Sequence, residues 1–152
     1  HDDEPLVTNI ARAPVLVGID GSPASEAATA IAFDEASRRG VGVMALHAWT
    51  DLRVSDFKEL FPNFNLDAEL SHEEETLGER LAGWQERYPD VGIVRKVEIG
   101  EPASPLIEAS KLAQLIVVGS HGRGGFAGML LGSVGAAVVN RARIPVIVAR
   151  QS

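Results

Sequence analysis

Short runs rich in valine and isoleucine alternate along this chain with segments of helical periodicity. The apolar runs, which predict strands, are 14–19, 41–49, 91–99, 115–118 and 145–149. The segments that predict helices are 23–39, 67–88, 104–111 and 133–140. Strands that alternate with helices are joined by right-handed crossovers, and these build a parallel sheet. The sequence therefore predicts the α/β class, with an open five-stranded parallel sheet and helices on both faces.

Local signals define the ends of the first helix. Ser22 suits the N-cap, Pro23 suits the first helical position, and Gly40 suits the residue after the last turn. One side of this helix carries apolar and mostly small residues, which are Ala24, Ala28, Ile31, Ala32 and Ala36.

The second helix, 67–88, combines an apolar stripe with a run of acids. Trp84 and Tyr88 continue the stripe and are predicted to pack in the core. The three glutamates at 73–75 are predicted to form a solvent-exposed face of the helix.

The chain is long enough for one domain. Its 152 residues can bury a core of their own. Residues 1–13 are acidic, contain proline and lack periodicity, so we expect a linker or tail there and a single domain over 14–152. The chain begins with His1 rather than Met, as expected of a domain taken from a longer protein.

Composition argues against several classes of function. A net charge of −7 argues against general nucleic-acid binding. No apolar run approaches the roughly 20 residues of a membrane span, so no membrane partner is expected. The absence of cysteine removes thiolate chemistry and favours a reducing, cytoplasmic location. Four scattered histidines lack the spacing of metal ligands, so no protein metal site is expected.

The charge is unevenly distributed, and its uneven part coincides with a glycine-rich stretch. Residues 109–152 carry +5 and no acid, whereas residues 1–108 carry −12. Six glycines lie between Gly119 and Gly132, and glycine lets backbone N–H groups converge on one point. Ser133 then begins a helix, whose first N–H groups lack partners. This stretch predicts an anion-binding loop, with Arg123 within reach of a phosphate.

Ligands of open α/β sheets bind outside the carboxyl ends of the strands, where the strand order reverses. The glycine-rich stretch follows the fourth strand and so lies at such an end. Two common phosphate loops do not fit it. A Walker A loop needs a lysine that is missing here, and a dinucleotide fingerprint at Gly122, Gly124 and Ala127 lacks the acid that should follow for the ribose.

The spacing Gly119-x2-Gly122-x9-Gly132-Ser133 resembles the nucleotide-binding pattern G-x2-G-x9-G-[S/T] of the universal stress protein family. Four further segments resemble the same family: VLVGIDGSPAS (15–25), LHAW (46–49), GEPASPLIEAS (100–110) and ARIPVIVAR (142–150). The resemblance covers 14–150 and is closest to the second domain of tandem-domain, actinobacterial members. It implies strand order 3-2-1-4-5, the adenine nucleotide alpha hydrolase-like fold, and a site for ATP with Mg²⁺.

The resemblance also implies which residues contact the nucleotide. Asp20 matches the acid that lies against the nucleoside, flanked by Gly18 and Ile19, and Ala48 matches the strand residue whose backbone meets the adenine. Asp51 is expected at the rim. The matches to the ribose and phosphate contacts, and the loop between them, are Gly119, Ser120, His121, Gly122, Arg123, Gly124, Gly125, Gly132, Ser133 and Val134.

The leading hypothesis is an ATP-binding regulatory domain of the stress response. Paired carboxylates, a Walker lysine and a supported Ser-His-Asp set are all missing from the sequence, so no catalytic residue is assigned. A slow ATPase, a cyclic-nucleotide binder and an interaction domain with a vacant site remain open alternatives. Asp20 also suits a simple turn, His121 a solvent-facing loop position, and Ser133 a helix cap.

The last strand, residues 145–149 from Pro145 to Ala149, lies at a sheet edge in the implied order. An uncharged edge rich in valine and isoleucine invites pairing with another strand. The resemblance implies antiparallel pairing with the same strand of another domain. We therefore expect self-association, or pairing of two domains within one chain.

Overall fold

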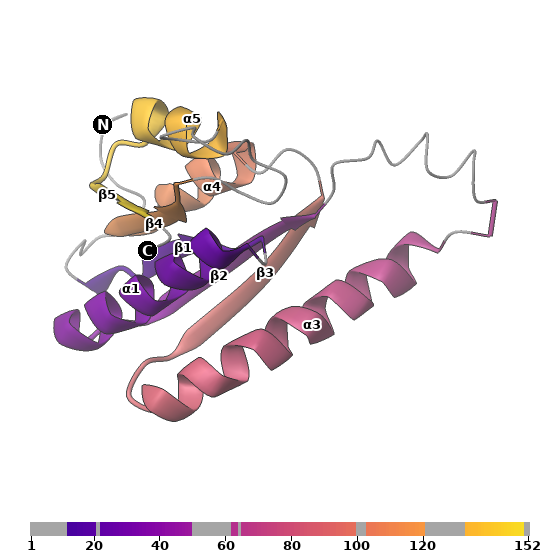
Figure 1. The fold of residues 1–152 in the computed structure, drawn as a ribbon, viewed down its shortest axis with the longest axis horizontal. Coiled ribbons are helices and arrows are strands. Elements are labelled where there is room, and N and C mark those ends of the chain that lie inside the picture. The colour runs from indigo at the N-terminus through magenta and orange to yellow at the C-terminus, as the bar shows by residue number, and fades with distance from the viewer. Residues whose placement is uncertain are drawn as a thin grey trace.

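The computed structural model describes residues 12–20, 22–49, 62–63, 65–99, 103–120 and 133–150. Five strands form one parallel sheet in the order β3-β2-β1-β4-β5 (Figure 1). The strands are β1 (Val15–Gly18), β2 (Val43–Trp49), β3 (Ile93–Ile99), β4 (Leu115–Gly119) and β5 (Val146–Ala149). The predicted fold class and strand order are confirmed.

Within the described residues, four helices connect these strands, and each begins and ends within one residue of its predicted range. They are α1 (Pro23–Arg39), α3 (Leu66–Arg87), α4 (Ala103–Ser110) and α5 (Ser133–Arg141). The predicted caps of α1 explain the agreement for that helix. Ser22 accepts a hydrogen bond from the Ser25 N–H, and Gly40 ends the helix in the left-handed conformation with φ 69°. Among the described residues, no helix has both the length and the apolar character needed to cross a membrane.

Within the described residues, two helices pack on each face of the sheet. On one face, α1 and α3 pack over the side chains of Val15, Val17, Val43 and Val117; in Figure 1, α1 lies in front of the strands. On the other face, α4 and α5 pack over Leu16, Met44, Ile116 and neighbouring residues. Successive residues of a strand point to opposite faces, so each central strand contributes to both cores.

Phe33 of α1 is the largest side chain buried completely in the described residues. Its ring stacks on Trp84 with centroids 5.9 Å apart, and lies 5.8 Å from the ring of Tyr88. The prediction that Trp84 and Tyr88 pack in the core is confirmed. Both side chains are only half-buried, because α3 lies over the edge of the sheet.

The edge strands differ in how far they are covered. In β3, Ile93 and Val97 pack against the core under α3, whereas Val94 is 55% exposed. This alternation is typical of an edge strand. In β5, the side chains of Val146, Ile147 and Val148 are half-buried and that of Ala149 is buried.

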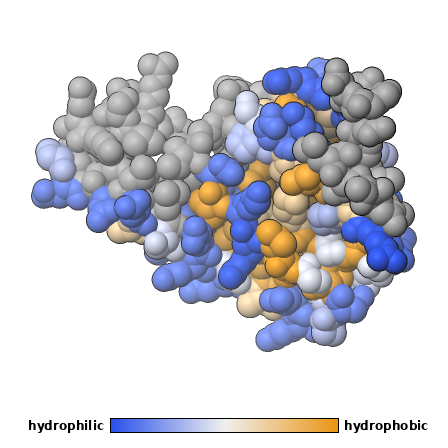
Figure 2. Space-filling model, turned by 180° about the vertical axis from the view of Figure 1, so that it is seen from behind, coloured by the Kyte–Doolittle hydropathy of each residue, from blue (hydrophilic) through white to orange (hydrophobic). Residues whose placement is uncertain are grey.

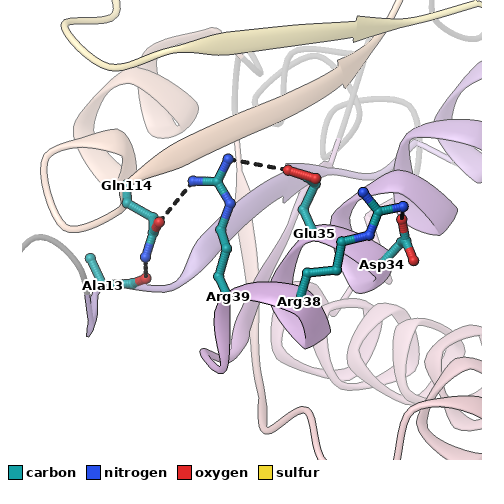
Figure 3. A network of polar contacts seen from close by, with 6 residues as sticks. All are labelled: Ala13, Asp34, Glu35, Arg38, Arg39 and Gln114. Carbon is teal, nitrogen blue, oxygen red and sulfur yellow. Dashed lines mark hydrogen bonds and ion pairs between the residues drawn. The ribbon is translucent and has the colours of Figure 1, made fainter.

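A polar network ties the end of α1 to the amino ends of β1 and β4 (Figure 3). Arg39 donates to Gln114 Oε1 at 2.8 Å and pairs with Glu35 at 3.1 Å. Gln114 in turn donates from Nε2 to the Ala13 carbonyl at 2.7 Å. Ala13 is buried although it falls within the predicted tail. The network thus holds the amino ends of these strands, which lie opposite the carboxyl ends where the ligand site is predicted.

Candidate functional site

The strand order reverses between β1 and β4. From β1 the chain proceeds to β2 and β3 on one side, and β4 and β5 follow on the other. Because β1 and β4 are parallel neighbours, their carboxyl ends lie side by side at the same end of the sheet. Gly18 ends β1, and Ile19 and Asp20 follow it beside the strand that ends at Gly119, at the position where open α/β sheets bind ligands.

Asp20 begins a tightly bonded turn. Its Oδ1 accepts a hydrogen bond from the Ser22 N–H at 2.8 Å, and its own N–H donates to Ser25 Oγ at 3.1 Å. The Ser25 N–H donates to Ser22 Oγ at 3.1 Å, which completes the N-cap of α1. The turn interpretation of Asp20 is thus confirmed. Contact with a nucleotide stays a prediction, compatible with a half-buried carboxylate at the strand end.

His47 of β2 contacts the residue that precedes this turn. Its Nδ1 is 2.7 Å from the Ile19 carbonyl oxygen, and its Nε2 is 3.0 Å from Glu73 Oε2 on α3. The prediction that all three glutamates at 73–75 face solvent is therefore wrong for Glu73. Its side chain is 22% exposed and is held against the imidazole.

Gly119 is required by packing as well as by the glycine pattern. A Cβ at this position would lie 2.9 Å from the backbone carbon and the Cβ of Ala24, and 3.1 Å from the Ser25 nitrogen. The end of β4 thus passes in direct contact with the first turn of α1. The next residue, Ser120, is buried and donates its N–H to the Ala149 carbonyl at 2.7 Å.

Both α1 and α5 begin at this end of the sheet, since each follows the carboxyl end of a parallel strand. Helix N-termini carry a partial positive charge and favour anions. The predicted helix start at Ser133, with Val134 in its first turn, is confirmed for the backbone. Ala48 lies near the end of β2, in register with Glu98.

The remaining candidate residues lie outside the described residues. They are Asp51, His121, Gly122, Arg123, Gly124, Gly125 and Gly132. The half of the site expected to hold the nucleoside is thus described, and most of the half expected to hold the phosphates is not. Within the described residues, no three acids or histidines lie close enough together to bind a metal ion.

A groove of about 480 Å³ lies elsewhere, between β3 and α4. It shares no residue with the predicted site. Figure 2 shows hydrophobic residues gathered in the middle of the molecule as seen from behind, framed by hydrophilic ones. The residues that line the groove are Leu46, Lys96, Glu98, Ser104, Pro105, Glu108, Ala109 and Leu112.

Comparisons with known proteins agree with the resemblance in the sequence. The model of the "Universal stress protein family" matches residues 12–150. Two universal stress proteins of Mycobacterium tuberculosis strain H37Rv are 60% identical over 153 residues and 58% identical over 152 residues. Each alignment covers all of this chain and 50% of the relative, so the chain spans about half the length of these relatives.

Solved structures share the fold. The universal stress protein UspA from Lactobacillus plantarum has a TM-score of 0.77 at 24% identity, with 93% of this chain and all of that chain covered. A universal stress protein in complex with cAMP has a TM-score of 0.64 at 25% identity, with 93% and 98% covered. One from Archaeoglobus fulgidus in complex with dAMP has a TM-score of 0.55 at 22% identity, with 90% and 97% covered.

Proposed function

Because this chain belongs to the universal stress protein family, we propose that it is a nucleotide-binding regulatory domain of the stress response. The nucleotide binds at the carboxyl edge of the sheet, between β1 and β4. One observation carries this proposal: Gly119, the first residue of the glycine pattern, ends the strand next to the Asp20 turn. A nucleoside against Asp20 then has its phosphates directed toward the helix that begins at Ser133.

ATP with Mg²⁺ is the proposed ligand, because the spacing from Gly119 to Ser133 is complete and a triphosphate uses the whole of it. Cyclic AMP is the second candidate, supported by the related structure that contains it. Both ligands present an adenine, a ribose and a phosphate to the same edge. A cytoplasmic location belongs to this proposal, because the cytoplasm is where free ATP is abundant.

Thermal unfolding tests the proposal and ranks the ligands. A ligand at 100 times its dissociation constant stabilises the folded state by about 2.7 kcal/mol. For a chain of this size the melting temperature then rises by about 5–10 °C. We expect this rise with ATP and Mg²⁺, a smaller one with cyclic AMP, and none with UTP. An unchanged melting temperature at millimolar ATP, in protein freed of bound nucleotide, would remove the proposed function.

The same preparation separates binding from hydrolysis. A regulatory binding domain returns ATP unchanged after hours of incubation. A slow ATPase, the alternative enzyme, releases phosphate steadily and in excess of the protein.

Mass spectrometry of molecules released from protein purified without added nucleotide identifies the ligand that the cell supplies.

We also propose pairing through β5, either between two chains or between two domains of one chain. The carbonyls of Pro145 and Ala149 bond to β4, so by alternation the N–H groups of Val146 and Val148 face outward. Val148→Pro removes an outward N–H and is expected to lower association measured by light scattering, with the fold retained. Ile147→Pro is the comparison, because it removes an N–H that faces β4 and should destabilise the sheet. Equal association with and without Val148→Pro contradicts the pairing.

A further inference from the structure

The peptide group between Ile19 and Asp20 is held at both ends by side chains. Its carbonyl oxygen lies 2.7 Å from His47 Nδ1 on β2, and its N–H donates to Ser25 Oγ on α1 at 3.1 Å. The Ile19 N–H also donates to the Leu46 carbonyl at 2.9 Å, which keeps the residue in line with β2 beyond the end of β1. Rotation of this peptide would break two hydrogen bonds in a part-buried setting, and each lost partner carries a desolvation cost.

The His47 ring is itself oriented by α3. Nε2 lies 3.0 Å from Glu73 Oε2, and the two side chains are 13% and 22% exposed. The Ile19 carbonyl can only accept a hydrogen bond, so Nδ1 is the donor in that contact. One imidazole thus connects α3, β2 and the end of β1.

We propose that His47 is a positioning residue for the nucleotide site, and that Glu73 orients it. His47 fixes the Ile19–Asp20 peptide, and the next bond of the turn, from the Ser22 N–H to Asp20 Oδ1, then sets the direction of the carboxylate. The affinity for nucleotide thereby depends on the position of α3. This inference rests on the proposed function, because it assigns Asp20 to the nucleotide.

Two substitutions divide the roles of the two ring nitrogens. The amide nitrogen of Asn occupies the place of Nδ1, and that of Gln occupies the place of Nε2. His47→Asn keeps the donor to Ile19 and loses the contact with Glu73, whereas His47→Gln does the reverse. We expect calorimetry with ATP and Mg²⁺ to give an affinity about tenfold weaker for His47→Gln, since the bond to the Ile19 carbonyl is lost. His47→Asn should keep most of the affinity.

Hydrogen exchange and NMR supply a readout that does not need a ligand. The Asp20 amide should exchange faster in His47→Gln than in His47→Asn, at matched global stability. In the unmodified chain, Nδ1 of His47 should give the ¹⁵N shift of a nitrogen that carries a hydrogen. Equal affinity and equal Asp20 exchange in the two variants would overturn the inference, as would an Nδ1 of His47 without a hydrogen. If the unmodified chain binds no nucleotide, the proposed function fails, while the exchange comparison still decides whether His47 holds the peptide.

Discussion

Phe33→Ala is expected to lower the free energy of unfolding by about 3–5 kcal/mol, the range for deleting a buried aromatic ring. Phe33 is fully buried and joins α1 to α3 through its contacts with Trp84 and Tyr88. Removing the ring leaves a cavity between the helix and the sheet and takes away the face on which Trp84 stacks. Urea unfolding followed by circular dichroism measures the change.

Phe33→Leu is the matched control, because it keeps most of the apolar volume and should cost far less. Trp84→Ala in the Phe33→Ala background should cost less stability than Trp84→Ala alone, since the effects of substitutions at residues in contact are not additive. A loss below about 1 kcal/mol for Phe33→Ala would contradict the packing described for this core.

Gly119→Ala is expected to weaken nucleotide binding at least about tenfold and to destabilise the fold by about 1–3 kcal/mol. The added Cβ would lie 2.9 Å from the backbone of Ala24, and backbone yields less readily than the end of a side chain. The end of β4 and the first turn of α1 must therefore move apart. That movement displaces Ser25, whose hydroxyl holds the Asp20 N–H.

Gly83→Ala is the control for this prediction. Gly83 lies within α3, and a Cβ there meets no atom within 4 Å, so alanine should leave binding unchanged and raise stability by up to about 1 kcal/mol. Calorimetry and urea unfolding are carried out on both variants. A Gly119→Ala chain that binds and unfolds like the unmodified one would show that the close contact is not needed.

The elements of the fold were predictable because their signals are local. The Ser22 cap, the Gly40 stop and the apolar strand runs need only a few neighbouring residues to be recognised. The strand order came from the family resemblance rather than from periodicity, since pairing between distant strands leaves no local signal. Phe33 was not singled out, because its aromatic partners lie about 50 residues further along the chain.

The candidate site was predictable in part, for the same reason. Asp20 and Gly119 belong to spaced motifs, and the structure brings the strands that carry them together. His47 and Glu73 were missed, since their contact joins residues 26 positions apart and Glu73 belongs to a run of glutamates. One signal was available: Val43, Ala45 and His47 occupy every second position of β2, which places His47 on the same, buried face as the other two. The close contact that excludes a side chain at Gly119 could not be predicted, because it depends on how α1 packs beside the end of β4.

NMR titration of the ¹⁵N-labelled chain with ATP and Mg²⁺ tests the central claim most directly. If the nucleotide binds between the ends of β1 and β4, the amide signals of Asp20, Gly119 and Ser120 shift and saturate. The amide signals of Gln114, at the opposite end of the strands, and of Lys96, in the groove beside α4, should then shift little. Saturable shifts confined to the groove between β3 and α4, with Asp20 and Gly119 unmoved, would contradict the account.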